Sequence, residues 1–252
     1  MTVTYISHCG FLVEWEHFYT LFDWWKGELP PLRADKPLLV FASHSHEDHF
    51  DKRIFTLPER HADTRFILSH DIRLATRRWE KLGMTREIFS RVTSLRSNTV
   101  YTADGLGTPL TVRTIHSTDL GVAFLLSAEG RLVYHAGDLN WWHWVEEGER
   151  YCQNMEASYA RAVARLADAV RDEAADCGRA PCIDVAFAPI DPRLGDDCDR
   201  GVAYLLEQIP VQTVFPMHMW DKYDWIDRYL RAHPDHAGQI ARITREDERF
   251  NV

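Results

Sequence analysis

The sequence predicts an α/β fold in which two mixed β-sheets pack face to face with helices on their outer sides. Three observations predict it. The first half of the chain consists mainly of short segments rich in aromatic and β-branched residues, residues 154–176 have the periodicity of one long amphipathic helix, and the remainder alternates strand-like runs with helical stretches. With 252 residues, 45% of them apolar, the chain can bury a large core, and we expect a single domain over residues 1–252.

The first half supplies most of the expected strands. In order, the segments are TVTYIS, FLVEWE, FYTLFDWW, LLVFAS, RFILS, TVYTADG, LTVRTIHS, GVAFLLSAEG and RLVYHAG. The run LLVFAS at 38–43 is continuously apolar, which suits a strand buried on both faces. A turn and a short helix should follow it, a further helix is expected within 71–82, and AEG predicts a hairpin between the last two strands.

The second half is more helical. Apolar side chains recur at three- and four-residue steps through 154–176, and Gly178 supplies a C-terminal stop. The runs IDVAFAPI and VQTVFP predict two more strands, accompanied by helices at about 199–208 and 221–232.

Composition narrows the functional classes. The 29 Lys and Arg residues against 38 Asp and Glu give a formal net charge of −9, which argues against a large nucleic-acid footprint and favours a small-molecule substrate. No apolar run reaches the roughly 18 residues of a membrane span, and the N-terminus lacks a secretory pattern, so a cytoplasmic location is expected. The five cysteines, none in a Cys-x-x-Cys pair, read as reduced thiols.

The segment SHSHEDHF carries the strongest chemical signal. It places His44, His46, Asp48 and His49 directly after the buried strand 38–43, where open α/β sheets bind ligands. His44 and His46 can point one way from an extended chain, whereas Asp48 and His49 face a second position. This spacing predicts two divalent metal ions about 3.5–4 Å apart. Imidazole with carboxylate favours zinc, with manganese or iron as alternatives.

Further ligand-type side chains stand at the ends of other expected strands. His116 ends LTVRTIH, Asp138 follows RLVYHAG, and His218 ends VQTVFPMH. Since a two-ion site needs ligands from several elements, we expect these three side chains to join the motif.

The motif His-x-His-x-Asp-His, a later His, a Gly-Asp after a strand and a final His together resemble the metallo-β-lactamase superfamily. The elements ISHCGFLVE, LFDWW, YHAGD and FPMH most resemble its branch containing ascorbate-6-phosphate lactonase and N-acyl-phosphatidylethanolamine phospholipase D, although Ser7 stands where that branch has Gly. The resemblance implies a four-layer αββα sandwich of two mixed β-sheets with helices on the outer faces.

The resemblance also implies a role for each residue. His44, His46 and His116 would hold the first ion, Asp48, His49 and His218 the second, and Asp138 both. Asp48, His49 and Asp138 accordingly receive the catalytic role. Asp23 would support the histidine motif from behind, as would His8.

Tryptophans surround the expected site. In NWWHW at 140–144, consecutive indoles cannot all point inward, so Trp141, Trp142, His143 and Trp144 are expected to contribute to the wall of a substrate pocket. Lys26, Arg193 and Lys222 could hold an anionic group or could equally be solvated surface charges.

These features predict a dinuclear metal-dependent hydrolase that uses a metal-bound hydroxide on a small-molecule lactone, phosphodiester or ester. Three alternatives stay open. A nucleic-acid phosphodiesterase of the same superfamily would need a basic path, and a metal-binding module without turnover would not need two complete ligand sets. A di-iron oxidoreductase would usually have a carboxylate in place of His46.

Overall fold

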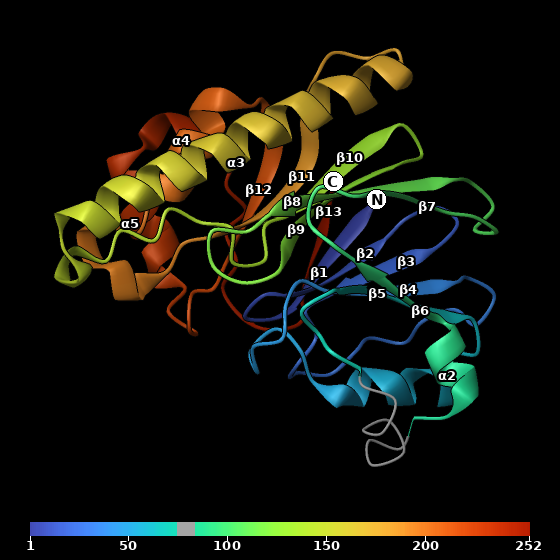
Figure 1. Ribbon diagram of the computed structural model, residues 1–252. Helices are drawn as coiled ribbons and strands as arrows, with labels where there is room; N and C mark the ends of the chain where they lie inside the picture. Colours follow the sequence, from blue (N-terminus) through green and yellow to red (C-terminus); the bar gives the residue numbers. More distant parts are fainter. Residues whose placement is uncertain (75–83) are drawn as a thin grey trace.

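The computed structural model describes residues 1–74 and 84–252, and two β-sheets face each other at its centre (Figure 1). The first sheet has the strand order β13-β1-β2-β3-β4-β5-β6 and the second the order β12-β11-β10-β9-β8-β7. Each is mixed, with antiparallel hairpins at one side and parallel strands at the other. The expected fold class, two mixed sheets with outer helices, is confirmed.

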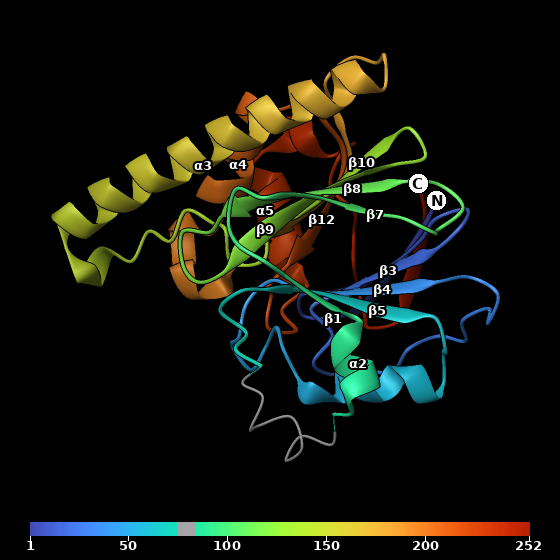
Figure 2. The same cartoon turned by 45° about the vertical axis from the view of Figure 1, so that its right-hand side comes forward.

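The first sheet is built mainly from the N-terminal third of the chain. Its strands are β1 (Thr2–Ser7), β2 (Gly10–Glu14), β3 (Tyr19–Phe22), β4 (Leu38–Ala42), β5 (Thr64–Ser69), β6 (Val92–Leu95) and β13 (Glu248–Asn251). Strands β3 to β6 are parallel neighbours, and β13 adds to β1 so that both termini lie at the same edge (Figures 1 and 2).

The second sheet follows in sequence. Its strands are β7 (Val100–Ala103), β8 (Leu110–His116), β9 (Val122–Ala128), β10 (Arg131–His135), β11 (Ile183–Pro189) and β12 (Val211–Met217). Strands β9 and β10 form the hairpin expected at AEG, and β10, β11 and β12 are parallel.

Helices cover the outer faces of both sheets. The long helix α3 (Glu149–Asp176) crosses the second sheet, beside α4 (Arg200–Gln208) and α5 (Asp224–Ala232), as Figure 2 shows. The short helices η1 (Lys52–Glu59) and α2 (Arg86–Ser90) lie on the first sheet (Figure 1). One apolar core fills the space between the sheets and under α3, and a smaller one lies under η1. Within the described ranges no helix is both long and apolar enough to cross a membrane.

The structure departs from the expected elements at the start of one helix and in elements that were not expected, among them helix α2. Helix α3 begins at Glu149, five residues before the expected start, and strands β6 and β13 were not expected. Both strands lie at sheet edges and are only partly buried, so they lack the apolar alternation that identifies a half-buried strand. The helix expected within 71–82 falls largely on 75–83, outside the described residues.

The carboxyl ends of several strands from both sheets meet at one place. His8 follows β1, Asp23 follows β3, and the histidine motif follows β4, whereas Asp138 follows β10 and His218 follows β12. Parallel neighbours bring such ends together along one edge of a sheet. Side chains distant in sequence therefore converge between the two sheets.

Candidate metal centre

The first group of potential ligands comes from the motif and from the turn after β10. Nε2 of His44 lies 3.0 Å from Nδ1 of His46 and 3.3 Å from Oδ2 of Asp138. His44 and Asp138 are buried and His46 is exposed, so the group opens to solvent on one side. The three side chains can offer their ligand atoms to one cation.

The second group lies on the other side of Asp138. Its Oδ1 is 3.1 Å from Nε2 of His49 and 3.4 Å from Nε2 of His218. Oδ2 of Asp48 is 3.8 Å from the same atom of His49 and 3.7 Å from that of His218. The two oxygens of Asp138 thus face two different sets of histidine nitrogens.

The spacing of these atoms fits metal ions. Ligand atoms about 2.1 Å from a tetrahedral ion lie about 3.4 Å from one another, and the separations in both groups run from 3.0 to 3.8 Å. Moreover, Nε2 of His49, Nε2 of His218 and Oδ1 of Asp138 are buried without a hydrogen-bond partner. Buried polar atoms without partners are costly, and a bound cation would satisfy all three at once.

Buried groups hold the opposite nitrogen of each imidazole. Nδ1 of His49 donates to Oδ2 of Asp23 over 2.7 Å, and Nδ1 of His44 lies 2.9 Å from Oγ of Ser43. Ser43 in turn donates to Asp23 through both its hydroxyl and its backbone N–H. These bonds leave Nε2 of His44 and of His49 facing the site, and Asp23 bonds both His49 and Ser43.

His218 is held in the same way by a residue that the sequence analysis missed. Its Nδ1 donates over 2.8 Å to Oδ2 of Asp191, a fully buried carboxylate that follows β11. Arg193 donates to the same carboxylate from Nε and from its backbone N–H. An Asp after a buried strand was the available signal, because IDVAFAPI ends directly before Asp191.

The neighbouring carboxylates and imidazoles of the site shift each other's pKa values. Burial alone would raise the pKa of Asp138, but the neighbouring imidazoles of His49, His44 and His218 outweigh burial, so the net pKa lies well below its usual value. Burial alone would lower the pKa of His49, yet Asp138 and Asp23 raise it well above normal. A proton on His49 therefore occupies a place where a cation would compete with it.

The backbone is strained around these side chains. His8, Asp23 and His218 have φ values of 54°, 42° and 63°, a left-handed conformation that non-glycine residues rarely adopt. Such residues persist only where surrounding contacts fix them, and they cluster at functional sites. Each of these three residues directly follows a strand, at the point where the chain turns and its side chain enters the site between the sheets.

The structure does not bring His116 to either group. Its side chain is exposed and lines a pocket whose other wall is α3, and it belongs to none of the groups of neighbouring ligand atoms in the described residues. Asp119, three residues later, lies nearer the motif, with its Oδ2 4.0 Å from Nδ1 of His46. The turn is tied to the start of the motif, because N–H of Val122 donates to the Ser43 carbonyl.

His8 and Cys9 offer ligand atoms within 4.8 Å of those of His49 and His218. Nε2 of His8 is 3.4 Å from Oδ2 of Asp48 and is buried without a hydrogen-bond partner, while its ring packs on that of His218. Cys9 lies beside His49, and burial raises the pKa of its thiol to about 12.

The NWWHW loop divides between the pocket and the core. Trp142 and Trp144 line a pocket of about 210 Å³ together with Asp119, Asp138 and Arg193. Nε1 of Trp142 also donates to the Asp138 carbonyl over 2.9 Å. Trp141 instead packs against tyrosines of α3 and α4, and His143 bonds Asp197, so neither lines this pocket.

The basic residues near the site behave differently from one another. Arg193 lies between the indoles of Trp144 and Trp220, with its guanidinium 5.7 and 4.9 Å from their centroids. Lys26 is paired with exposed acids, and Lys222 is exposed. Of the three, Arg193 alone lines the pocket over Asp138.

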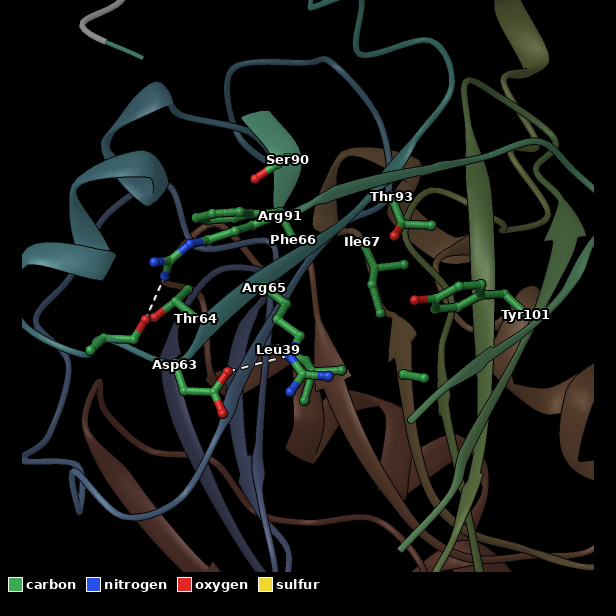
Figure 3. A pocket seen from close by; sticks show the side chains of 12 residues that line it. Leu39, Asp63, Thr64, Arg65, Phe66, Ile67, Ser90, Arg91, Thr93 and Tyr101 are labelled. Carbon is green, nitrogen blue, oxygen red and sulfur yellow. Dashed lines mark hydrogen bonds and ion pairs between the residues drawn. The ribbon is translucent and has the colours of Figure 1, made fainter. Parts of the chain in front are cut away.

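Another hollow, of about 600 Å³, lies beside β5 and shares no residue with the metal-ligand groups (Figure 3). Its two arginines are already engaged. Arg65 donates to Asp63 and to a backbone carbonyl, and Arg91 donates to the Ala62 carbonyl and to Glu87. The hollow therefore offers no free charge for chemistry.

No protein-family model matches the sequence, and no curated protein matches it. Solved structures do match. Igni18, a metallo hydrolase from the archaeon Ignicoccus hospitalis, is 17% identical with a TM-score of 0.55, and the match covers 100% of this chain and 98% of that one. An isothiocyanate hydrolase from Delia radicum gut bacteria is 11% identical with a TM-score of 0.59, covering 100% and 99%.

A third structure is CmlA, a diiron β-hydroxylase from Streptomyces venezuelae. It is 12% identical with a TM-score of 0.63, and the match covers 100% of this chain but 54% of CmlA. At these identities the matches show a shared fold, which is the two-sheet arrangement that the resemblance to the metallo-β-lactamase superfamily implies.

Proposed function

We propose that this protein is a metal-dependent hydrolase that acts on a small-molecule lactone, phosphodiester or ester through a centre of two divalent cations. The observation that carries the proposal is the position of Asp138, whose Oδ2 faces His44 while its Oδ1 faces His49 and His218. Two solved structures that share the fold over nearly their whole length, Igni18 and the isothiocyanate hydrolase, are named as hydrolases, which supports the proposal.

The ligand sets are assigned by proximity, and Asp119 joins the first because its Oδ2 is 4.0 Å from Nδ1 of His46. His44, His46 and Asp119 would hold the first cation with Oδ2 of Asp138, and the second would be held by its Oδ1 with the following three side chains: Asp48, His49 and His218. When bound, the cations would lower the pKa of a water molecule and polarise the scissile bond.

The protein's own contribution is preorganisation. Asp23 and Asp191 fix the rings of His49 and His218 before any substrate arrives, and Trp142 fixes the backbone at Asp138. Hydrolysis adds one water molecule across one bond, so the reaction needs no oxidant or organic cofactor. The pocket over Asp138, about 210 Å³ and bounded by two indoles, suits a small substrate with an apolar part.

The test is a panel of lactones, phosphodiesters and carboxylic esters with the metal-loaded protein. We expect turnover of one bond class, and we expect its loss in His46→Ala together with loss of metal. His70→Ala is the matched control because His70 is exposed and belongs to no ligand group. No turnover of any class by fully metallated protein would refute the proposal, as would an active, fully metallated His46→Ala variant.

One observation favours a second candidate, a di-iron oxidoreductase. If Asp119 rather than His116 is a ligand, the first ion has two imidazoles, from His44 and His46, and two carboxylates, from Asp119 and Asp138. Such a set suits iron or manganese better than a set with three histidines does. The fold shared with a diiron β-hydroxylase is compatible with this candidate. Iron-loaded protein that consumes dioxygen with an added reductant, yet hydrolyses nothing, would favour it over the hydrolase.

A further inference from the structure

A second pocket, of about 330 Å³, adjoins the one over Asp138. It lies between helix α3 and the turn that follows β8. Thr118 and Asp119 line both pockets, so a molecule could occupy the two at once. The side chains that characterise the second pocket are His116, Ser117 and Thr118 from the turn and Ser158, Arg161 and Arg165 from α3.

The two arginines of this pocket are not neutralised by neighbours. Arg161 donates to Oγ of Ser158 over 3.0 Å, and within the described part of the chain neither Arg161 nor Arg165 forms an ion pair with a carboxylate. Farther along the same helix, Arg171 does pair with Asp168. Asp119 is the one carboxylate among the described residues that line this pocket, and the two guanidinium groups on α3 outnumber it.

The two arginines stand on one side of α3. They are four residues apart, so they lie one above the other on the helix, where like charges disfavour each other. A bound oxyanion would remove that repulsion and accept hydrogen bonds from both guanidinium groups. His116 and the hydroxyl of Ser117 lie on the opposite wall and add further polar contacts.

The turn that forms the other wall is fixed to the metal centre. Oγ1 of Thr118 donates to the Asn140 carbonyl over 2.7 Å and accepts from the Asn140 N–H over 3.1 Å. Asn140 lies two residues after Asp138, so the turn and the candidate ligand keep one relative position. The distance from the second pocket to the reacting bond is thereby set by the fold.

We propose that the pocket of His116, Arg161 and Arg165 binds an oxyanion group of the substrate, a phosphate or a carboxylate, remote from the bond that is hydrolysed. This rests on the proposed hydrolase function for the reaction, but the binding itself does not depend on turnover. His116, expected to be a metal ligand, thus contributes to recognition of an anion instead.

The experiment compares wild type with the double variant Arg161→Gln/Arg165→Gln, which keeps side-chain length and removes both charges. Arg171→Gln is the matched control, since Arg171 lies on the same helix outside the pocket. With two esters that share a scissile bond, one carrying a remote phosphate, the double variant should lose about tenfold or more in kcat/KM for the anionic ester, mainly through KM. Its kcat/KM for the neutral ester should hold.

A binding arm separates this proposal from the hydrolase proposal. Inorganic phosphate and acetate are titrated into the metal-loaded proteins, and the one that binds more tightly identifies the type of oxyanion. Phosphate or acetate should bind the double variant about tenfold more weakly than wild type and Arg171→Gln. If wild type, the double variant and Arg171→Gln bind each anion equally, the proposed subsite is overturned, even if an ester is hydrolysed. If the double variant binds an anion more weakly than the other two proteins, the subsite is supported, even if no ester is hydrolysed.

Discussion

Nδ1 of His218 donates a hydrogen bond over 2.8 Å to Oδ2 of Asp191, whose side chain is fully buried. The bond fixes the proton on Nδ1 and leaves Nε2 as the free ligand atom, which faces Asp138. Asp23 does the same for His49. Both histidines of the second ligand set are therefore oriented by carboxylates from different sheets, and the set exists only when the sheets are packed together.

Asp191→Asn should weaken the second metal site. The amide can still contact Nδ1 but no longer supplies the charge that fixes the imidazole, so affinity for one metal equivalent should fall about 10- to 100-fold. Competition with a metal-binding dye measures it. Asp196→Asn is the control, because Asp196 lies in the same loop with 94% of its side chain exposed. Unchanged affinity at both equivalents in Asp191→Asn would contradict the role of Asp191.

Asp119→Ala and His116→Ala should separate the two candidates for the remaining ligand of the first ion. The position of Asp119 beside His46 predicts that Asp119→Ala loses one tight metal equivalent. His116→Ala should keep two, because its side chain faces α3. Titration of both variants checks this, and the reverse pattern would restore His116 as the ligand.

Removal of metal should lower thermal stability. Ions bound at about 1,000 times their Kd each contribute about 4 kcal/mol, and for a chain of this size about 1 kcal/mol shifts Tm by roughly 2–4 °C. Chelation should therefore lower Tm by about 10 °C or more, and added metal should restore it. If the metal content is verified before chelation and its removal leaves Tm unchanged, the two ligand groups do not bind ions in the folded state.

Gly121→Ala should be strongly destabilising. A Cβ there would lie 2.1 Å from the Ser43 carbonyl oxygen, and φ is +71°. Gly130 has a nearly identical φ of +70° with no atom within 4 Å, so Gly130→Ala isolates the cost of the conformation, about 1–2 kcal/mol. We expect Gly121→Ala to exceed that cost by at least about 2 kcal/mol in urea unfolding. Similar losses in both variants would mean that the turn can move away from the motif.

Trp144→Ala should raise KM and leave kcat and metal content nearly unchanged. Trp144 lines the pocket without a hydrogen bond from its indole to a candidate ligand, so it contributes contact area to ground and transition states alike. Trp142→Ala is the informative comparison, because it also removes the bond to the Asp138 carbonyl and should reduce metal affinity. Loss of kcat with unchanged KM in Trp144→Ala would instead assign its indole to the positioning of the centre.

The sequence predicts those parts of the site that are local in the chain. Four ligand-type side chains within six positions after a buried strand can be identified by spacing alone, and Asp138 and His218 stand at clear strand ends. The structure brings all six of these side chains together. The interior strands β4 and β11 were also predictable, because nearly all of their residues are apolar.

The sequence does not predict the direction in which the side chains of a turn or loop point. His116 ends a strand and Asp138 follows the end of another, yet in the turn after β8 it is Asp119, rather than His116, that lies near His46. Asp191 was missed because a single Asp after a strand has no spacing pattern. Trp141 and Trp142 are adjacent in sequence, but only packing against α3 and α4 separates their roles.

The central claim is a two-ion centre bridged by Asp138, and metal stoichiometry tests it most directly. Protein purified without chelator, or stripped and then titrated, should bind two divalent ions per chain, as measured by elemental analysis and calorimetry. Asp138→Asn should retain at most one tight equivalent, because its loss removes the charge shared by both sites. One ion or none in the wild-type chain, or two tight ions in Asp138→Asn, would contradict the account.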